Sequence, residues 1–98
     1  MIVRVVKMTF KPEAVEEFKA IFEASKEKIK AQNGCHYLSM LQDIHQPTIF
    51  FTYSYWAAEE NLQDYKNSSV FGSVWPRTKA LFADRPEAWS LHQHIELE

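Results

Sequence analysis

The sequence predicts an α+β fold in which an antiparallel sheet carries helices on one face. Three observations predict it: some short segments are rich in β-branched and aromatic residues, others repeat apolar residues at spacings of three and four, and the two kinds follow the order β-α-β-β-α-β. That order is typical of the ferredoxin-like, split β-α-β arrangement. The expected strands are residues 2–10, 35–43, 49–56 and 89–97.

The start of the chain predicts a strand followed by a long helix. Residues 2–10 are rich in β-branched side chains, and one phase of this strand is apolar except at Arg4. Pro12 suits the first position of a helix, and carboxylates follow it in the first turn. An apolar stripe predicts that this helix runs to about Gln32, and Gly34 suits the left-handed position that ends it.

The middle of the chain predicts a hairpin and a short helix. Residues 35–43 and 49–56 are separated by a short connection, so we expect them to pair antiparallel. Residues 59–66 form the short helix, in which Leu62 and Tyr65 face inward. No side chain at its start is suited to cap it.

The end of the chain predicts another helix and a last strand. Asn67-Ser68-Ser69 offers N-caps for the helix. Pro76 lies inside the helical pattern, so either the helix starts near Gly72–Ser73 and Pro76 falls in its first turn, or Pro76 kinks it. Residues 89–97 alternate apolar and polar side chains, which predicts a strand with one polar face.

Composition narrows the class of protein. A chain of 98 residues, 46% hydrophobic and 24% charged, fits one globular domain over residues 1–98. The net charge is −2 and basic residues do not gather on one predicted face, so we expect no nucleic-acid binding. No apolar run approaches the ~20 residues of a membrane helix, and no signal peptide is recognisable, so we expect no membrane association. Cys35 is the only cysteine, which excludes an internal disulfide and favours the cytoplasm.

The third strand predicts a homodimer. Its stretch FFTYSYW places aromatic side chains on both faces of the strand, whereas the helices can cover only one face of the sheet. A large exposed apolar patch is unusual for a monomer. We therefore expect two copies to pack their open sheet faces together about a two-fold axis, as a barrel. Because both phases are aromatic, the sequence leaves open which one faces the helices.

Four short motifs, in order, carry a resemblance to a known family. They are KPE (Lys11–Glu13), NGCH (Asn33–His36), LQD (Leu41–Asp43), and Trp56 followed by SSVF (Ser68–Phe71). Over almost its whole length the chain resembles the antibiotic biosynthesis monooxygenase family. The resemblance implies a dimeric α+β barrel. It also implies an enzyme, since many members are oxygenases of quinols and polycyclic aromatics that need no metal or other cofactor.

The chain departs from two patterns within that family. Heme-degrading relatives use an Asn, a Trp and a His, and the matching positions here are Val6, Tyr65 and Trp75. No axial ligand for heme iron is therefore present at the matching position, and heme degradation by that mechanism is not expected. Quinol-type relatives place a His nine residues after the strand-ending Trp, where this chain again has Tyr65.

Three residues are candidates for catalysis. Arg4 can hold a substrate enolate or a developing superoxide anion, or else it is an edge arginine that reaches water or a carboxylate. The phenol of Tyr65 can donate a hydrogen bond or, if its pKa is lowered, act as a base. His36 is the third candidate, because histidine is the side chain best suited to proton transfer near neutrality, or else it lies at the rim or at an interface.

Further residues are candidates for substrate contact. Trp56 and Trp75 can wall a flat apolar pocket between helices and sheet, or else they only pack the core. The remaining expected contacts are Val6, Phe71 and Tyr53. His92 and His94 point the same way, but no third ligand accompanies them, so we expect no metal site.

Two functions remain open from the sequence. The first is a cofactor-independent monooxygenase of a small aromatic or quinol-like substrate. The second is a non-catalytic dimer, either one that binds a small apolar ligand in the same pocket or a stress-associated protein. Isomerase chemistry on a small sugar-like substrate needs anion-binding residues that the sequence does not place.

Overall fold

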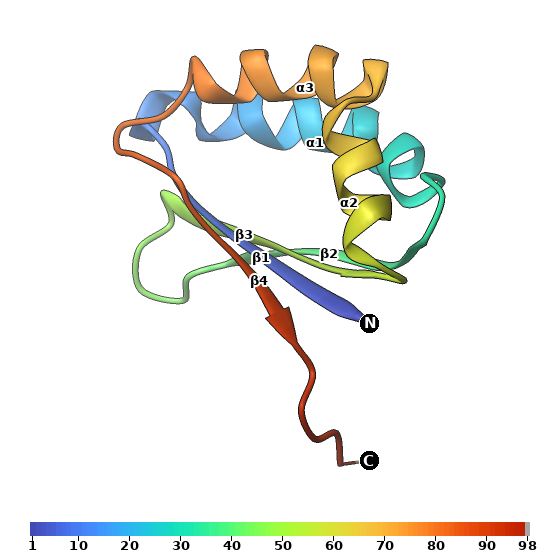
Figure 1. Ribbon diagram of the computed structural model, residues 1–98. Coiled ribbons are helices and arrows are strands. Elements are labelled where there is room, and N and C mark those ends of the chain that lie inside the picture. Colours follow the sequence, from blue (N-terminus) through green and yellow to red (C-terminus); the bar gives the residue numbers. More distant parts are fainter. Residues whose placement is uncertain (98) are drawn as a thin grey trace.

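The computed structural model describes residues 1–97 and has two layers, helices above and a sheet below (Figure 1). The order of elements confirms the predicted α+β, ferredoxin-like class. No helix within these residues is long and apolar enough to cross a membrane. The elements are β1 (Ile2–Thr9), a 3₁₀ turn (Pro12–Ala14), α1 (Val15–Lys30), β2 (Cys35–Gln42), β3 (Ile49–Trp56), α2 (Glu59–Lys66), α3 (Ser69–Lys79) and β4 (Glu87–His92).

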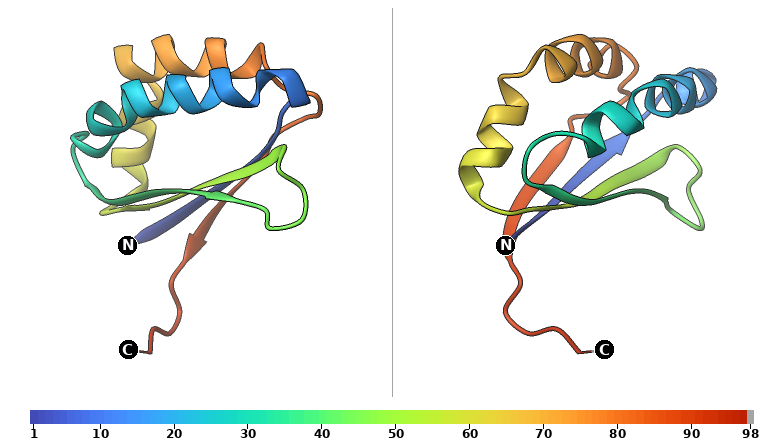
Figure 2. Two further views of the ribbon diagram at one scale, coloured as in Figure 1. Left: turned by 180° about the vertical axis from the view of Figure 1, so that it is seen from behind. Right: turned by 90° about the vertical axis from the view of Figure 1, so that its right-hand side faces the viewer.

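The sheet has the strand order β2-β3-β1-β4, and every neighbouring pair is antiparallel. The helices cover one face of it and leave the other open (Figure 2). The central strand β1 pairs with both β3 and β4, so Val6 lies opposite Thr52 on one side and Ala88 on the other. This register decides which side chains meet beneath the helices.

The core fixes which phase of each strand faces the helices. Met8, Phe10, Phe18 and Phe50 form one buried cluster, and the rings of Phe10 and Phe18 stack with centroids 4.1 Å apart. Side chains alternate between the two faces of a strand. Even-numbered residues of β1 and β3 therefore face the helices, and odd-numbered residues face the open side, which answers the question that the sequence left open.

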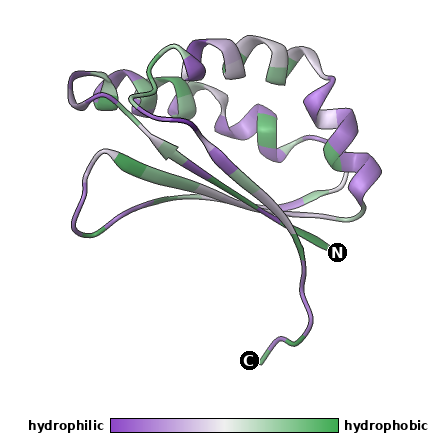
Figure 3. Ribbon diagram, turned by 60° about the vertical axis from the view of Figure 1, so that its left-hand side comes forward, coloured by the Kyte–Doolittle hydropathy of each residue, from purple (hydrophilic) through white to green (hydrophobic). Residues whose placement is uncertain are grey.

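The last strand is shorter than predicted. It ends at His92, which lies opposite Ile2, the first residue of β1. Beyond that point no neighbouring strand offers backbone partners, so the alternation that continues to Leu97 is not used in a sheet. This tail extends past the edge of the sheet (Figure 3), and Ile95 within it is 74% exposed.

Two other local predictions are resolved. Helix α3 begins at Ser69, and the Ser68 hydroxyl oxygen accepts a hydrogen bond from the Phe71 N–H at 3.2 Å. Pro76 therefore lies in the helix interior and not in its first turn. Because proline has no N–H, it cannot donate a hydrogen bond to the backbone carbonyl four residues back. Gly34 has a φ of 83° and follows the end of α1, as predicted.

Candidate functional site

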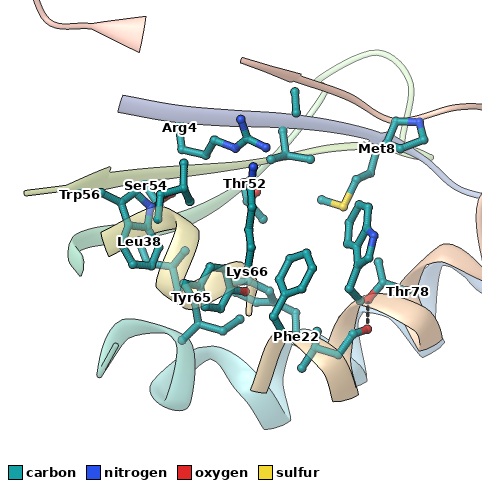
Figure 4. A pocket seen from close by; sticks show the side chains of 18 of the residues that line it. Arg4, Met8, Phe22, Leu38, Thr52, Ser54, Trp56, Tyr65, Lys66 and Thr78 are labelled. Atoms are coloured by element: carbon teal, nitrogen blue, oxygen red, sulfur yellow. Dashed lines mark hydrogen bonds between the residues drawn. The ribbon is translucent and has the colours of Figure 1, made fainter. Parts of the chain in front are cut away.

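A cavity of about 320 Å³ lies between the helices and the covered face of the sheet (Figure 4). Its volume falls at the small end of the range found for small-molecule sites. All three helices and the four strands contribute to its lining. The site is therefore built by the whole fold rather than by one loop.

The cavity exists because small side chains occupy the middle of the covered face. Along β3 the covered phase reads Phe50, Thr52, Ser54, Trp56, with large rings at the ends and small polar residues between them. Across the sheet, Thr52 lies opposite Val6. The rings at the ends hold the helices away from the sheet, and the small residues leave the space beneath them unfilled.

One wall of the cavity is a continuous series of aromatic rings. Trp56 and Tyr65 stack with centroids 5.2 Å apart, Tyr65 meets Phe71 edge-on at 5.2 Å, and Phe71 stacks on Trp75 at 5.6 Å. The indole Nε1 of Trp56 donates to the Ser54 hydroxyl oxygen at 2.9 Å, so this buried donor is satisfied. The wall therefore offers apolar aromatic surface to a ligand.

Two cations line the same cavity. Arg4 on β1 donates from Nη1 to the Ser90 hydroxyl oxygen at 2.9 Å, and Lys66 lies at the end of α2. In Figure 4 both side chains reach into one part of the cavity. Burial lowers the pKa of Arg4; burial, and then the charge of Arg4, lower the pKa of Lys66. Among residues 1–97, no Asp, Glu or His lines the cavity beside them.

Tyr65 is a neutral phenol in this environment. Burial, and secondarily the neighbouring Cys35, raise the pKa of Tyr65 to about 12. A phenol with that pKa stays protonated near neutrality, so it can donate a hydrogen bond to a ligand and is poorly suited to act as a base.

Most of the predicted site residues meet in this cavity. Arg4, Val6, Trp56, Tyr65, Phe71 and Trp75 all line it. His36 does not: it is exposed at the start of β2, where a bulge lies between Cys35 and Tyr37. Tyr53 does not line it either, because it belongs to the phase of β3 that faces the open side. His36 and Tyr53 therefore lie outside the lining of this cavity.

Most of the chain matches one known protein family. The family model for antibiotic biosynthesis monooxygenase matches residues 1–74. The chain belongs to this family. The resemblance predicted from its motifs is thereby confirmed. No curated protein matches the sequence.

Several solved structures share the fold of this chain, although their sequences are only distantly similar to it. A conserved protein from Methanosarcina mazei Go1 is 24% identical, with 95% of this chain and 93% of that chain covered and a TM-score of 0.89. Rv0793 from Mycobacterium tuberculosis is 12% identical, with 99% and 98% covered and a TM-score of 0.90. A point mutant of SnoaB, a cofactor-independent oxygenase from Streptomyces nogalater, is 16% identical, with 98% and 95% covered and a TM-score of 0.87. These likenesses establish the fold.

Sequence reasoning missed part of the lining. Lys66 follows Leu62 by four residues on α2, and residues at that spacing share a helix face. Because Leu62 was expected to face inward, that spacing could have placed Lys66 at the pocket. Thr52 and Ser54 share a phase with Trp56, but a strand with aromatics on both faces gave no signal for choosing that phase.

The remaining chemistry-bearing residues do not form a second site. Cys35 is buried, burial raises the pKa of its thiol, and its Sγ lies 3.7 Å from the Tyr37 carbonyl oxygen. It is a core residue rather than a reactive thiol. Within residues 1–97 no group of three or more His, Cys, Asp or Glu side chains is placed to share a metal ion.

The open face of the sheet carries a second group of aromatics. Tyr37, Tyr53 and Tyr55 pack against one another, and the Tyr55 hydroxyl donates to that of Tyr53 at 3.4 Å. That hydrogen bond is the main reason why the pKa of Tyr55 is raised to about 12. Nearby on the same face, Trp89 and Leu91 are 40% and 46% exposed. This apolar surface lies on the side of the sheet opposite the cavity.

Proposed function

We propose that the protein is a monooxygenase of a small aromatic or quinol-like substrate and that it works without a bound cofactor. The observation that carries the proposal is the cavity itself, in which an aromatic wall that includes the neutral Tyr65 accompanies Arg4. Membership of the monooxygenase family supports the same reaction class. The substrate ring stacks along the wall, and its oxygen lies toward Arg4.

Arg4 and Tyr65 act on the substrate by stabilising negative charge. A guanidinium and a phenol O–H both donate hydrogen bonds to an oxyanion, and such donors are stronger where water is excluded. They favour the ionised quinol over the neutral one. They also stabilise superoxide when it forms beside the ring.

The reaction balances without an external reductant. The quinolate transfers one electron to O₂, which gives a semiquinone radical and superoxide. These combine at a ring carbon, and the resulting hydroperoxide loses water. The sum is quinol plus O₂ giving hydroxyquinone plus water, so one oxygen atom enters the product and the ring supplies all the electrons. The protein contributes orientation, exclusion of water and stabilisation of the anion.

One observation favours a second function, the binding of a ligand without turnover. Among residues 1–97 no His, Asp or Glu lines the cavity, and Tyr65 keeps its proton. A substrate that needs a strong base is not served by this site. The cavity then holds a small aromatic ligand, and O₂ has no part in its function.

We also propose that the protein acts as a homodimer in the cytoplasm. The proposed interface is the open face of the sheet, where Tyr37, Tyr53, Tyr55, Trp89 and Leu91 gather. Two such faces related by a two-fold axis cover each other. The single buried Cys35 thiol suits a reducing compartment.

Oxygen consumption separates the two functions. Protein treated with a chelator is incubated with anthrone and with a panel of naphthohydroquinones, beside protein-free controls that correct for autoxidation. We expect O₂ uptake and a product with one more oxygen atom and two fewer hydrogen atoms than the substrate. We expect Thr52→Phe to abolish both, because its ring projects into the cavity where the substrate would lie. Thr52→Val, which keeps the shape of the residue, is the matched control. Uptake equal to the protein-free rate for every compound contradicts the monooxygenase.

A further inference from the structure

We propose that the natural ligand of the cavity is a planar aromatic anion whose charged group lies between Arg4 and Lys66. This inference deepens the proposed function, because it names the class of substrate for the same site. It also holds for a binding protein without turnover. The charged group is a carboxylate or the oxygen of an acidic phenol, and both present the same chemistry to the two cations.

The first support is the balance of charge. Arg4 and Lys66 are the charged residues among those that line the cavity, and neither forms a salt bridge with any residue among 1–97. On the helix surface, by contrast, Lys19 and Lys26 pair with carboxylates at 3.2 Å and 2.8 Å. Two like charges that share a partly desolvated site repel each other. A bound anion compensates both.

The second support is the set of hydrogen-bond donors. The Nη1 atom of Arg4 is used by Ser90, which holds the guanidinium on the covered face and leaves its other N–H groups for a ligand. The planar guanidinium suits a carboxylate, and Lys66 adds a point charge from the helix side. The Ser54 oxygen accepts from Trp56, so its own O–H is available to donate toward the cavity.

The third support is the shape of the site. The wall from Trp56 to Trp75 is aromatic and apolar, and the cavity of about 320 Å³ suits a ligand of two or three fused rings. The cations lie at one part of this space. A ligand with rings at one end and an anion at the other fits both parts, whereas a neutral aromatic gives neither cation a salt-bridge partner.

The site also accounts for the lack of a base in the cavity. A ligand that arrives as an anion needs no group to remove its proton. The absence of His, Asp and Glu from the lining among residues 1–97 is then a feature of the site, since a carboxylate there would repel the ligand. An anionic ligand therefore explains a feature that a neutral quinol leaves unexplained.

Calorimetric titration with unreactive probes tests the proposal under anaerobic conditions. The probes are 2-naphthoate, its neutral isostere 2-naphthamide, and 2,4-dinitro-1-naphtholate as an acidic phenol. We expect at least one anion to bind about tenfold or more tightly than the amide, and its identity distinguishes carboxylate from phenolate. In Arg4→Met and in Lys66→Met we expect most of this preference to disappear while the amide binds as before. Lys79→Met, which removes an exposed charge outside the cavity, is the control and keeps the preference.

The outcomes separate this proposal from the monooxygenase. Equal binding of anions and amide by the wild type overturns it, as does a preference that survives in both variants once circular dichroism shows that they are folded. Binding is measured with probes that do not react with O₂, so it is independent of turnover. A clear anion preference of the probes, together with no O₂ uptake from the quinol panel, contradicts only the monooxygenase. Uptake with neutral quinols and no anion preference contradicts only the proposal made here.

Discussion

Arg4 and Ser90 are joined across neighbouring strands by a hydrogen bond of 2.9 Å from the guanidinium Nη1 to the serine hydroxyl oxygen. The two residues lie directly opposite each other in the register of β1 and β4. The bond holds the guanidinium on the covered face of the sheet, where the cavity lies. Ser90 is itself exposed, so this contact positions Arg4 without belonging to the core.

Replacing Ser90 tests this positioning. Ser90→Ala removes an acceptor from a charged donor, and one such bond contributes roughly 1.5–3 kcal/mol when fully formed and less when exposed. We expect a loss of about threefold to tenfold in affinity for the anionic probe, with an unchanged melting temperature. Ser90→Thr keeps the hydroxyl and should retain the affinity. An affinity that Ser90→Ala leaves unchanged shows that Arg4 needs no such support.

The two glycines predict opposite effects on stability. Gly34 has a φ of 83°, and a Cβ added there meets the Cβ of Asn61 at 2.7 Å. Gly34→Ala should therefore lower the free energy of unfolding by at least about 1–2 kcal/mol. Gly72 lies in α3 with nothing within 4 Å of an added Cβ, so Gly72→Ala should raise that free energy by about 0.5–1 kcal/mol. Urea unfolding of both variants measures the contrast, and equal shifts contradict it.

Tyr65 predicts a loss of stability at high pH. Its pKa is about 12 in the folded chain, against about 10 for an unfolded tyrosine. Between these values the unfolded chain releases the proton and the folded chain keeps it. The contribution of Tyr65 is therefore complete below pH 10 and disappears as the pH rises through 12, and it amounts to roughly 2 kcal/mol.

Urea unfolding at pH 8.5 and pH 11 measures this contribution. The wild type should lose more stability over that interval than Tyr65→Phe, which has no proton to release at this position. Tyr55 also has a raised pKa, but it is present in both proteins and cancels in the comparison. Parallel losses in the two proteins contradict the assignment of the raised pKa to Tyr65.

The open face of the sheet predicts the oligomeric state. Light scattering at low micromolar concentration should give a mass near twice the 11.5 kDa of one chain. Leu91→Glu places a charge on the open face, within the proposed interface, and should shift the mass to that of one chain. Ile44→Glu is the matched control, because Ile44 is 90% exposed in the connection between β2 and β3. A wild-type protein that stays monomeric contradicts the dimer.

The local predictions from sequence succeeded where one physical signal dominated. The apolar stripe predicted α1, in which Phe18 and Ile29 are buried. Gly34 and Ser68 indicated where helices end and begin. The extent of the last strand could not be predicted. Alternating apolar and polar side chains indicate that a strand has two different faces, but they do not indicate where the strand beside it begins. That limit is Ile2, which pairs with His92.

The site was predictable only in part. Residues placed by family motifs, such as Trp56 and Tyr65, do line the cavity. Thr52 could be assigned to the lining only once the structure showed which phase of β3 is covered, and Lys66 only once it showed which face of α2 points inward. A cavity depends on which large and small side chains meet across strands, and that register is not local in the sequence.

Isotope labelling tests most directly whether the cavity is the site of a monooxygenation. The best substrate of the quinol panel is turned over under ¹⁸O₂, and the reaction is stopped at once and its product analysed by mass spectrometry. We expect one ¹⁸O atom in each product molecule, none acquired from H₂¹⁸O, and no labelled product with Thr52→Phe. An unlabelled product, or no product beyond the protein-free control, contradicts the monooxygenase.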